Sequence, residues 1–261
     1  MTTLVLAAVE EEGFRGPSAR EFVFPPIVAG ITKPMVLLVL AAAIAFAFYW
    51  FALRRAQVVP SRLQFAGESV YGFVRNNIGR DLIGSKDFLP YVPFLVALFT
   101  FVLVNNLFAI VPLLQFPTMS RVAFPYVLAA IVWLTYNYVG IRRHGFGGYF
   151  RLQTMPPGVP AWIYPILIPL EFLSNILIRP ITLSLRLFAN MFAGHLLLLV
   201  FVLGAEYMLL EGGLGVKLLS PFAFGMGIVM SFFELLVQVL QAYIFTLLTA
   251  LFIGTALADE H

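Results

Sequence analysis

The sequence predicts an all-α polytopic membrane protein with five transmembrane helices and one amphipathic surface helix. Of its 261 residues, 61% are hydrophobic and 11% are charged, whereas a soluble domain is about half apolar and about a quarter charged. The apolar residues form long runs without the polar alternation of an outer-membrane barrel, which favours helices. The absence of Cys excludes disulfides and thiolate metal sites. A net charge of +3 gives little support for a nucleic-acid partner.

The first half of the chain contains three predicted spans. Residues 34–53 are uncharged and are bounded on both sides by basic residues, and a run of that length can cross a bilayer. Residues 88–114 and 122–141 predict the second and third spans. We expect residues 1–32 to form an arm on the outer side, because their apolar stretch TTLVLAAV is too short to span and lacks the basic residues of a signal peptide.

Residues 61–87 are expected to form a helix on the inner membrane surface. Ser61 can cap its N-terminus, and apolar and charged residues follow each other at helical spacing. The predicted apolar face consists of Leu63, Phe65, Val70, Phe73, Val74 and Ile78, with Arg62, Glu68, Arg75 and Arg80 outside it. Residues 142–160 are rich in Arg, Gly and Pro, which predicts a loop.

Two long apolar runs follow, at residues 161–205 and 217–257. Each would be about 60 Å long as a helix, twice the hydrocarbon core of about 30 Å, so each is two spans or one strongly tilted helix. Placing residues 54–87 and 142–160 inside puts nine Lys and Arg there and five outside. Splitting the first run would put the basic segment RPITLSLR outside. We therefore predict single tilted helices, with the N-terminus outside and the C-terminus inside.

Polar residues are regularly spaced along both long runs. Spacings of three or four residues place each set on one helix face, and polar residues in membrane helices face protein or water. The first set is Asn175, Arg179, Thr182, Arg186 and Asn190, and the second is Ser231, Glu234, Gln238 and Gln241.

The titratable residues His195 and Glu234 lie on the outer side of Arg186, the deeper of the two arginines. If Arg186 is level with Gln241 in an antiparallel pair, His195 lies about 13.5 Å and Glu234 about 10.5 Å toward the outside. The two groups then share one depth beyond a fixed cation, which predicts a proton path that ends at a barrier. His195 lies on the opposite helix face from Arg186.

These polar residues also have structural interpretations. Arg179 can extend to the inner headgroups, and a histidine such as His195 is often only a hydrogen-bonding group. Gln238 and Gln241 can join neighbouring helices by hydrogen bonds. The pair Asn105-Asn106 is interpreted as helix-end structure.

The stretches LSLRLFANMFAGHLLLLVF and FELLVQVLQAYIFTLLTALFIG resemble the a subunit of F-type ATP synthase. The resemblance implies that Arg186 faces the carboxylates of a rotating ring of c subunits, with Gln241 as its neighbour. It implies that Asn190 is the polar residue one turn on, and that His195 and Glu234 serve the outer half-channel. The implied partners are the c-ring, the b subunit of the peripheral stalk and the other Fo subunits, with no cofactor.

Glu171 departs from the family pattern. It resembles the acid that family members carry on the inner part of this helix, but it lies one residue further from Arg186 than the common spacing. An inserted residue accommodated as a π-bulge would explain the difference.

Other function classes receive less support. An ion-coupled secondary transporter usually shows repeated halves, and no repeat is visible. A structural anchor of a respiratory complex would not need aligned polar stripes on two helices. No HxxxH, GxSxG or GxxxxGK[ST] motif occurs, so we expect a non-catalytic subunit whose partners carry out the ATP chemistry. The expected location is a bacterial plasma membrane, with the mitochondrial inner membrane as the alternative.

Overall fold

The computed structural model describes residues 16–17, 32–54, 57–111, 114, 116–155 and 160–258. All regular secondary structure in these ranges is helical. Five helical stretches are long and apolar enough to cross a membrane, namely Lys33–Leu53, Leu89–Leu107, Ala123–Thr154, Tyr164–Leu210 and Leu214–Leu257. The predicted fold class is therefore confirmed. The predicted outer arm lies almost entirely outside the described residues.

The first span, α2 (Lys33–Leu53), is followed by a helix that differs from the predicted surface helix. This second stretch consists of α3 (Arg62–Phe73), the π-helix η2 (Val74–Arg80) and α4 (Asp81–Ile83). The Ser61 hydroxyl caps it by accepting a hydrogen bond from the Gln64 N–H, as the sequence predicts. Its apolar residues do not share one membrane face, because Val74 and Ile78 are buried in the protein core while Leu63 and Phe65 are exposed.

The second span is shorter than predicted. It comprises η3 (Leu89–Tyr91) and α5 (Val92–Leu107), and the chain then turns. A turn at η4 (Thr118–Ser120) leads into the third span.

The loop prediction for residues 142–160 is wrong up to Thr154. Helix α6 (Ala123–Thr154) continues to that residue and is broken only at Gly145, where φ is 71°. A left-handed conformation favours glycine, and it lets the second arm fold back on the first. At Gly140 a Cβ atom would lie 2.1 Å from the Tyr149 ring, so the returning arm packs directly on the glycine backbone.

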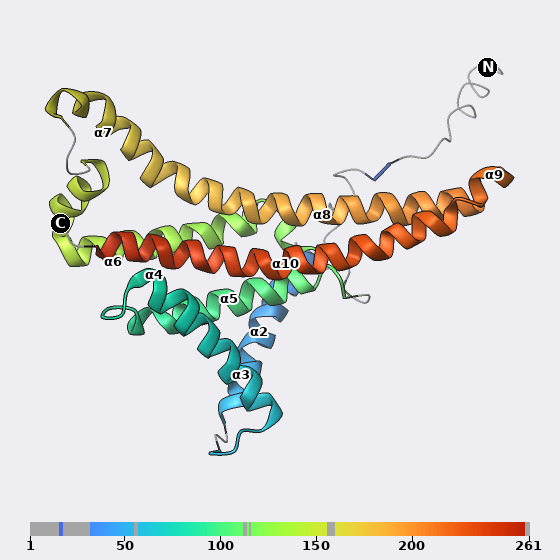
Figure 1. The fold of residues 1–261 in the computed structure, drawn as a ribbon, viewed down its shortest axis with the longest axis horizontal. Helices are drawn as coiled ribbons and strands as arrows, with labels where there is room; N and C mark the ends of the chain where they lie inside the picture. Colours follow the sequence, from blue (N-terminus) through green and yellow to red (C-terminus); the bar gives the residue numbers. More distant parts are fainter. Residues whose placement is uncertain are drawn as a thin grey trace.

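The last hundred residues form the two long helices. The first comprises η5 (Ala161–Ile163), α7 (Tyr164–Phe172), the π-helix η6 (Leu173–Ile178) and α8 (Arg179–Leu210), and the second comprises α9 (Leu214–Lys217) and α10 (Ser220–Leu257). They lie side by side along the longest axis of the molecule, and α10 also contacts α4, α5 and α6 (Figure 1). Stretches of 47 and 44 residues are roughly 70 Å long, more than twice the hydrocarbon core. Helices of this length would tilt in a bilayer or extend beyond its hydrocarbon core.

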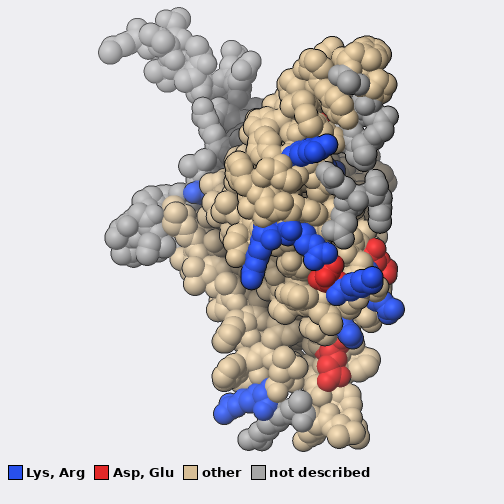
Figure 2. Space-filling model, turned by 90° about the vertical axis from the view of Figure 1, so that its left-hand side faces the viewer, with Lys and Arg blue, Asp and Glu red and all other residues tan. Residues whose placement is uncertain are grey.

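One end of the molecule is rich in basic side chains. Lys and Arg gather on the face that carries α4 and the second arm of α6 (Figure 2). The helices at this end contribute Arg80, Arg142 and Arg151.

Candidate functional site

Helix α8 has one packed face and one open face. Leu183, Leu187, Met191 and His195 recur every four residues and are buried, as expected for side chains stacked on one side of a helix. On the other side, Thr182, Arg186, Ala189, Asn190 and Ala193 are exposed. The Arg186 side chain therefore lies on a surface that the described residues do not cover, and His195 lies on the opposite face, as predicted.

Two close approaches fix how α8 and α10 are aligned. A Cβ atom at Gly194 would lie 3.5 Å from Glu234 Cγ, and one at Gly227 would lie 3.7 Å from Phe201 Cβ. Because the helices are antiparallel, equal counts from these contacts put Arg186 level with Ala242, one residue from Gln241. The same count makes His195 level with the residue before Glu234. The relative depths predicted from the sequence are thus reproduced.

A chain of hydrogen-bonded polar groups runs along the α8–α10 contact. The Asn190 amide donates to Gln241 Oε1 at 2.7 Å. One turn further along α10, the Gln238 amide donates to Glu234 Oε1 at 3.0 Å. The Asn106 amide of α5 donates to the backbone carbonyl of Gln238 at 3.0 Å. Three helices therefore contribute to one polar cluster.

Several atoms of this cluster have no hydrogen-bond partner among the described residues. They are Asn106 Oδ1, Glu234 Oε2, Gln238 Oε1 and Gln241 Nε2, and all are buried. Buried polar atoms normally require a partner, and water supplies one where the site has room. A pocket of about 320 Å³ is lined by three of these residues, Glu234, Gln238 and Gln241, and also by Asn190 and Gly194. The arrangement is suited to a short chain of water molecules next to a carboxylate.

A second polar group lies toward the basic end of the molecule. Asn175 donates to Glu171 Oε2 at 3.0 Å and to the Gln153 carbonyl at 2.7 Å. The Arg179 guanidinium lies 5.4 Å from the centre of the Phe252 ring, close enough for a cation–π contact. Arg179 therefore packs against α10 instead of only extending outward. The predicted π-bulge is present, because η6 (Leu173–Ile178) lies between Glu171 and Arg186.

The chain is similar to known proteins over nearly its whole length. Residues 35–254 match the family described as ATP synthase A chain. The chain belongs to this family. It is 50% identical to ATP synthase subunit a of a Nocardioides species over 98% of both chains. It is 46% identical to that of Pseudarthrobacter chlorophenolicus over the full length of both, and 42% identical to that of Streptomyces lividans over 95% of this chain and 90% of the relative.

Membership of the ATP synthase A chain family places the protein in ATP synthesis and hydrogen-ion transport. It also agrees with the five apolar helices of a multi-pass membrane protein. The family resemblance drawn from the two C-terminal sequence stretches is therefore confirmed.

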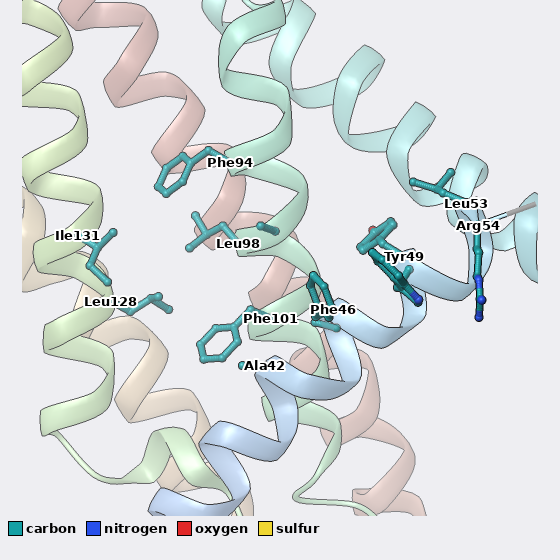
Figure 3. Close-up of a pocket in the computed structure, with 13 residues that line it drawn as sticks. Ala42, Phe46, Tyr49, Leu53, Arg54, Phe94, Leu98, Phe101, Leu128 and Ile131 are labelled. Atoms are coloured by element: carbon teal, nitrogen blue, oxygen red, sulfur yellow. The ribbon is translucent and has the colours of Figure 1, made fainter. Parts of the chain in front are cut away.

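In this ATP synthase A chain family member, a cavity larger than the pocket at the polar cluster lies elsewhere among the described residues. It has a volume of about 750 Å³ and lies between α2, α5 and α6. Apolar side chains such as Phe46, Leu98 and Ile131 line most of it, with Arg54 at one end (Figure 3). By contrast, the smaller pocket is lined by Glu234, Gln238 and Gln241, and we call it the polar pocket.

Sequence reasoning missed two parts of the site. Asn106, interpreted only as helix-end structure, is fully buried and contacts Gln238. Gln153 and Tyr149 lie in the segment predicted to be a loop, yet Gln153 donates to the Tyr149 hydroxyl at 3.3 Å beside Asn175. An asparagine inside an apolar span is a usable signal for the first. No sequence pattern pairs the second arm of α6 with η6.

Proposed function

We propose that the chain is the proton-conducting stator subunit of an F-type ATP synthase. In this proposal it provides two aqueous half-channels and an arginine that exchange protons with the carboxylates of a rotating c-ring. The ATP chemistry belongs to other subunits. The observation that carries the proposal is the position of Arg186, exposed on α8 one turn from the polar pocket.

The surroundings of Arg186 favour an anionic membrane partner. Its exposed neighbours on α8 include Ile181 and Leu185, and α10 exposes Leu236 and Leu240. A guanidinium on such a surface is costly in hydrocarbon unless it is paired. A carboxylate on an apolar partner helix would supply the pair and would hide the apolar surface. The c-ring carboxylate has this chemistry.

The outer half-channel is assigned to the pocket beside Glu234. A proton that enters through water there can reach a ring carboxylate near Asn190 and Gln241. The neutral carboxyl group can then move into lipid, where the charged form is too costly. His195 is buried at the same depth but does not line this pocket. We assign it to the opposite side of α8, as a base that relays protons toward Glu234.

The inner half-channel is assigned to Glu171 and Asn175. Arg186 lies between the two paths, and because an arginine keeps its proton in proteins, it prevents direct leakage from one path to the other. Its positive charge also favours the ionised form of a ring carboxylate, which releases the proton on the inner side.

The proposed orientation has the basic end inside. The face shown in Figure 2 gathers Lys and Arg, and cytoplasmic segments are enriched in these residues. In this orientation, the C-terminal end of α10 would lie in the cytoplasm and the α8–α9 turn outside, in a bacterial plasma membrane. The b subunit and the other Fo subunits are further proposed partners.

Proton pumping driven by ATP in inverted membrane vesicles tests the proposal. Arg186→Ala and Arg186→Lys should both abolish pumping, because a desolvated lysine can lose its proton and lacks the planar fork of arginine. Arg142→Ala, an exposed arginine on α6, is the matched control and should pump normally. Co-purification of a ring of small carboxylate-bearing subunits is also expected. Full pumping by Arg186→Lys would refute the assignment.

A further inference from the structure

The backbone of η6 (Leu173–Ile178) contains a gap in its hydrogen-bond ladder. The Arg179 N–H donates to the Ser174 carbonyl, five residues back, as in a π-helix. The next residue is Pro180, which has no N–H to donate. In a regular ladder this residue would serve Ile176, four residues back, or Asn175, five residues back. Pro180 therefore donates a hydrogen bond to neither carbonyl.

Two side chains of α6 donate to these same carbonyls. Trp133 Nε1–H donates to the Ile176 carbonyl at 2.9 Å. The Tyr136 hydroxyl donates to the Asn175 carbonyl at 3.2 Å, and the Tyr136 side chain is 1% exposed. Residues three apart lie on one helix face, so the pair on α6 matches two consecutive carbonyls on η6. A neighbouring helix thus donates to both carbonyls that Pro180, without an N–H, cannot serve.

We propose that Trp133 and Tyr136 are positioning residues for the inner half-channel. They hold the π-helix in place and thereby set the direction of Glu171 and Asn175. This inference rests on the proposed function, because it assigns a purpose to the position of these two groups.

The consequence follows from helix geometry. One residue corresponds to about 100° of rotation in an α-helix. The π-helix accommodates one extra residue. If η6 became regular α-helix, that residue would rotate Glu171 and Asn175 by about 100° relative to Arg186. The Asn175 bond to the Gln153 carbonyl of α6, at 2.7 Å, requires the present phase, because it joins two different helices.

The first test removes one donor at a time in the assembled complex. Tyr136→Phe keeps the ring and deletes only the hydroxyl donor, whereas Trp133→Phe deletes the Nε1–H donor and replaces the indole with a smaller aromatic ring. A buried carbonyl left without a donor should raise local opening, and hence hydrogen exchange over residues 171–181, by about 5- to 150-fold. Trp162→Phe and Tyr138→Phe are matched controls, since these side chains are 79% and 63% exposed. The controls should leave exchange unchanged.

The second test restores the missing donor. Pro180→Ala supplies an N–H for the Ile176 carbonyl, so Trp133→Phe should have a much smaller effect on exchange in that background than alone. This rescue would not occur if Trp133 acted only by packing.

Proton pumping then tests whether the Trp133 and Tyr136 hydrogen bonds matter for the proposed inner half-channel. We expect Trp133→Phe and Tyr136→Phe to lower ATP-driven pumping while the controls do not. Unchanged exchange, or raised exchange with normal pumping, would overturn the inference. Failure of the proposed function is a separate result, since it would appear as normal coupling in Arg186→Ala whatever the exchange data show.

Discussion

Gly194 offers a graded test of the polar pocket. A Cβ atom at this position would lie 3.5 Å from Glu234 Cγ and 3.6 Å from both Cδ and Oε1. These are ordinary contact distances, so Gly194→Ala should be tolerated. A leucine adds three more carbon atoms, which must enter the pocket of about 320 Å³ in front of the carboxylate. The added carbons would displace the water that a proton path needs, and a barrier raised by about 1–3 kcal/mol slows passage by a factor of about 5 to 150.

The assay compares ATP-driven proton pumping in inverted vesicles at equal amounts of assembled complex. Gly194→Ala should pump near the normal rate and Gly194→Leu about 5- to 150-fold more slowly. Gly225→Leu is the matched control, because Gly225 lies on α10 with no atom within 4 Å of its added Cβ. If Gly194→Leu pumped as fast as Gly225→Leu, the pocket would not be the outer path.

Three further substitutions test other parts of the structure. Glu234→Gln keeps the shape and the Gln238 contact but cannot ionise, so pumping should fall by about 10- to 100-fold, near the lower end for a positioned proton-transfer group. Asn106→Leu removes the buried donor to the Gln238 carbonyl and should destabilise the complex by about 1 kcal/mol in thermal unfolding. Gly140→Ala would place its Cβ 2.1 Å from the Tyr149 ring and should cost about 1–3 kcal/mol, measured against Gly147→Ala, whose Cβ meets nothing within 4 Å.

The spans and the polar stripes could be predicted from the sequence because both depend on local pattern. Length and hydropathy identify the five apolar stretches, and a period near 3.6 places Arg186 and His195 on opposite faces of α8. The inserted residue before Arg186 could also be recognised, because Glu171 lies one residue further from Arg186 than in the family pattern. These inferences need no knowledge of tertiary contacts.

The second arm of α6 could not be predicted in the same way. Its Arg and Gly content is typical of a loop, and Gly145 does break the helix. What restores helical structure beyond Gly145 is packing, with Tyr149 against Gly140 and the Tyr149 hydroxyl donating to Asn137 at 3.1 Å. The missed role of Asn106 has a similar cause, since its partner Gln238 lies 132 residues further along the chain.

The two arginines of α8 show how tertiary context separates residues that the sequence makes equivalent. Arg179 and Arg186 are seven residues apart, two turns, and so occupy nearly the same face. Opposite Arg179, α10 presents the Phe252 ring at 5.4 Å, and a cation–π contact of roughly 0.5–2 kcal/mol holds the guanidinium inside the protein. Among the described residues, no aromatic ring makes such a contact with Arg186. The Arg186 side chain is exposed, as the proposed contact with a carboxylate on another subunit requires.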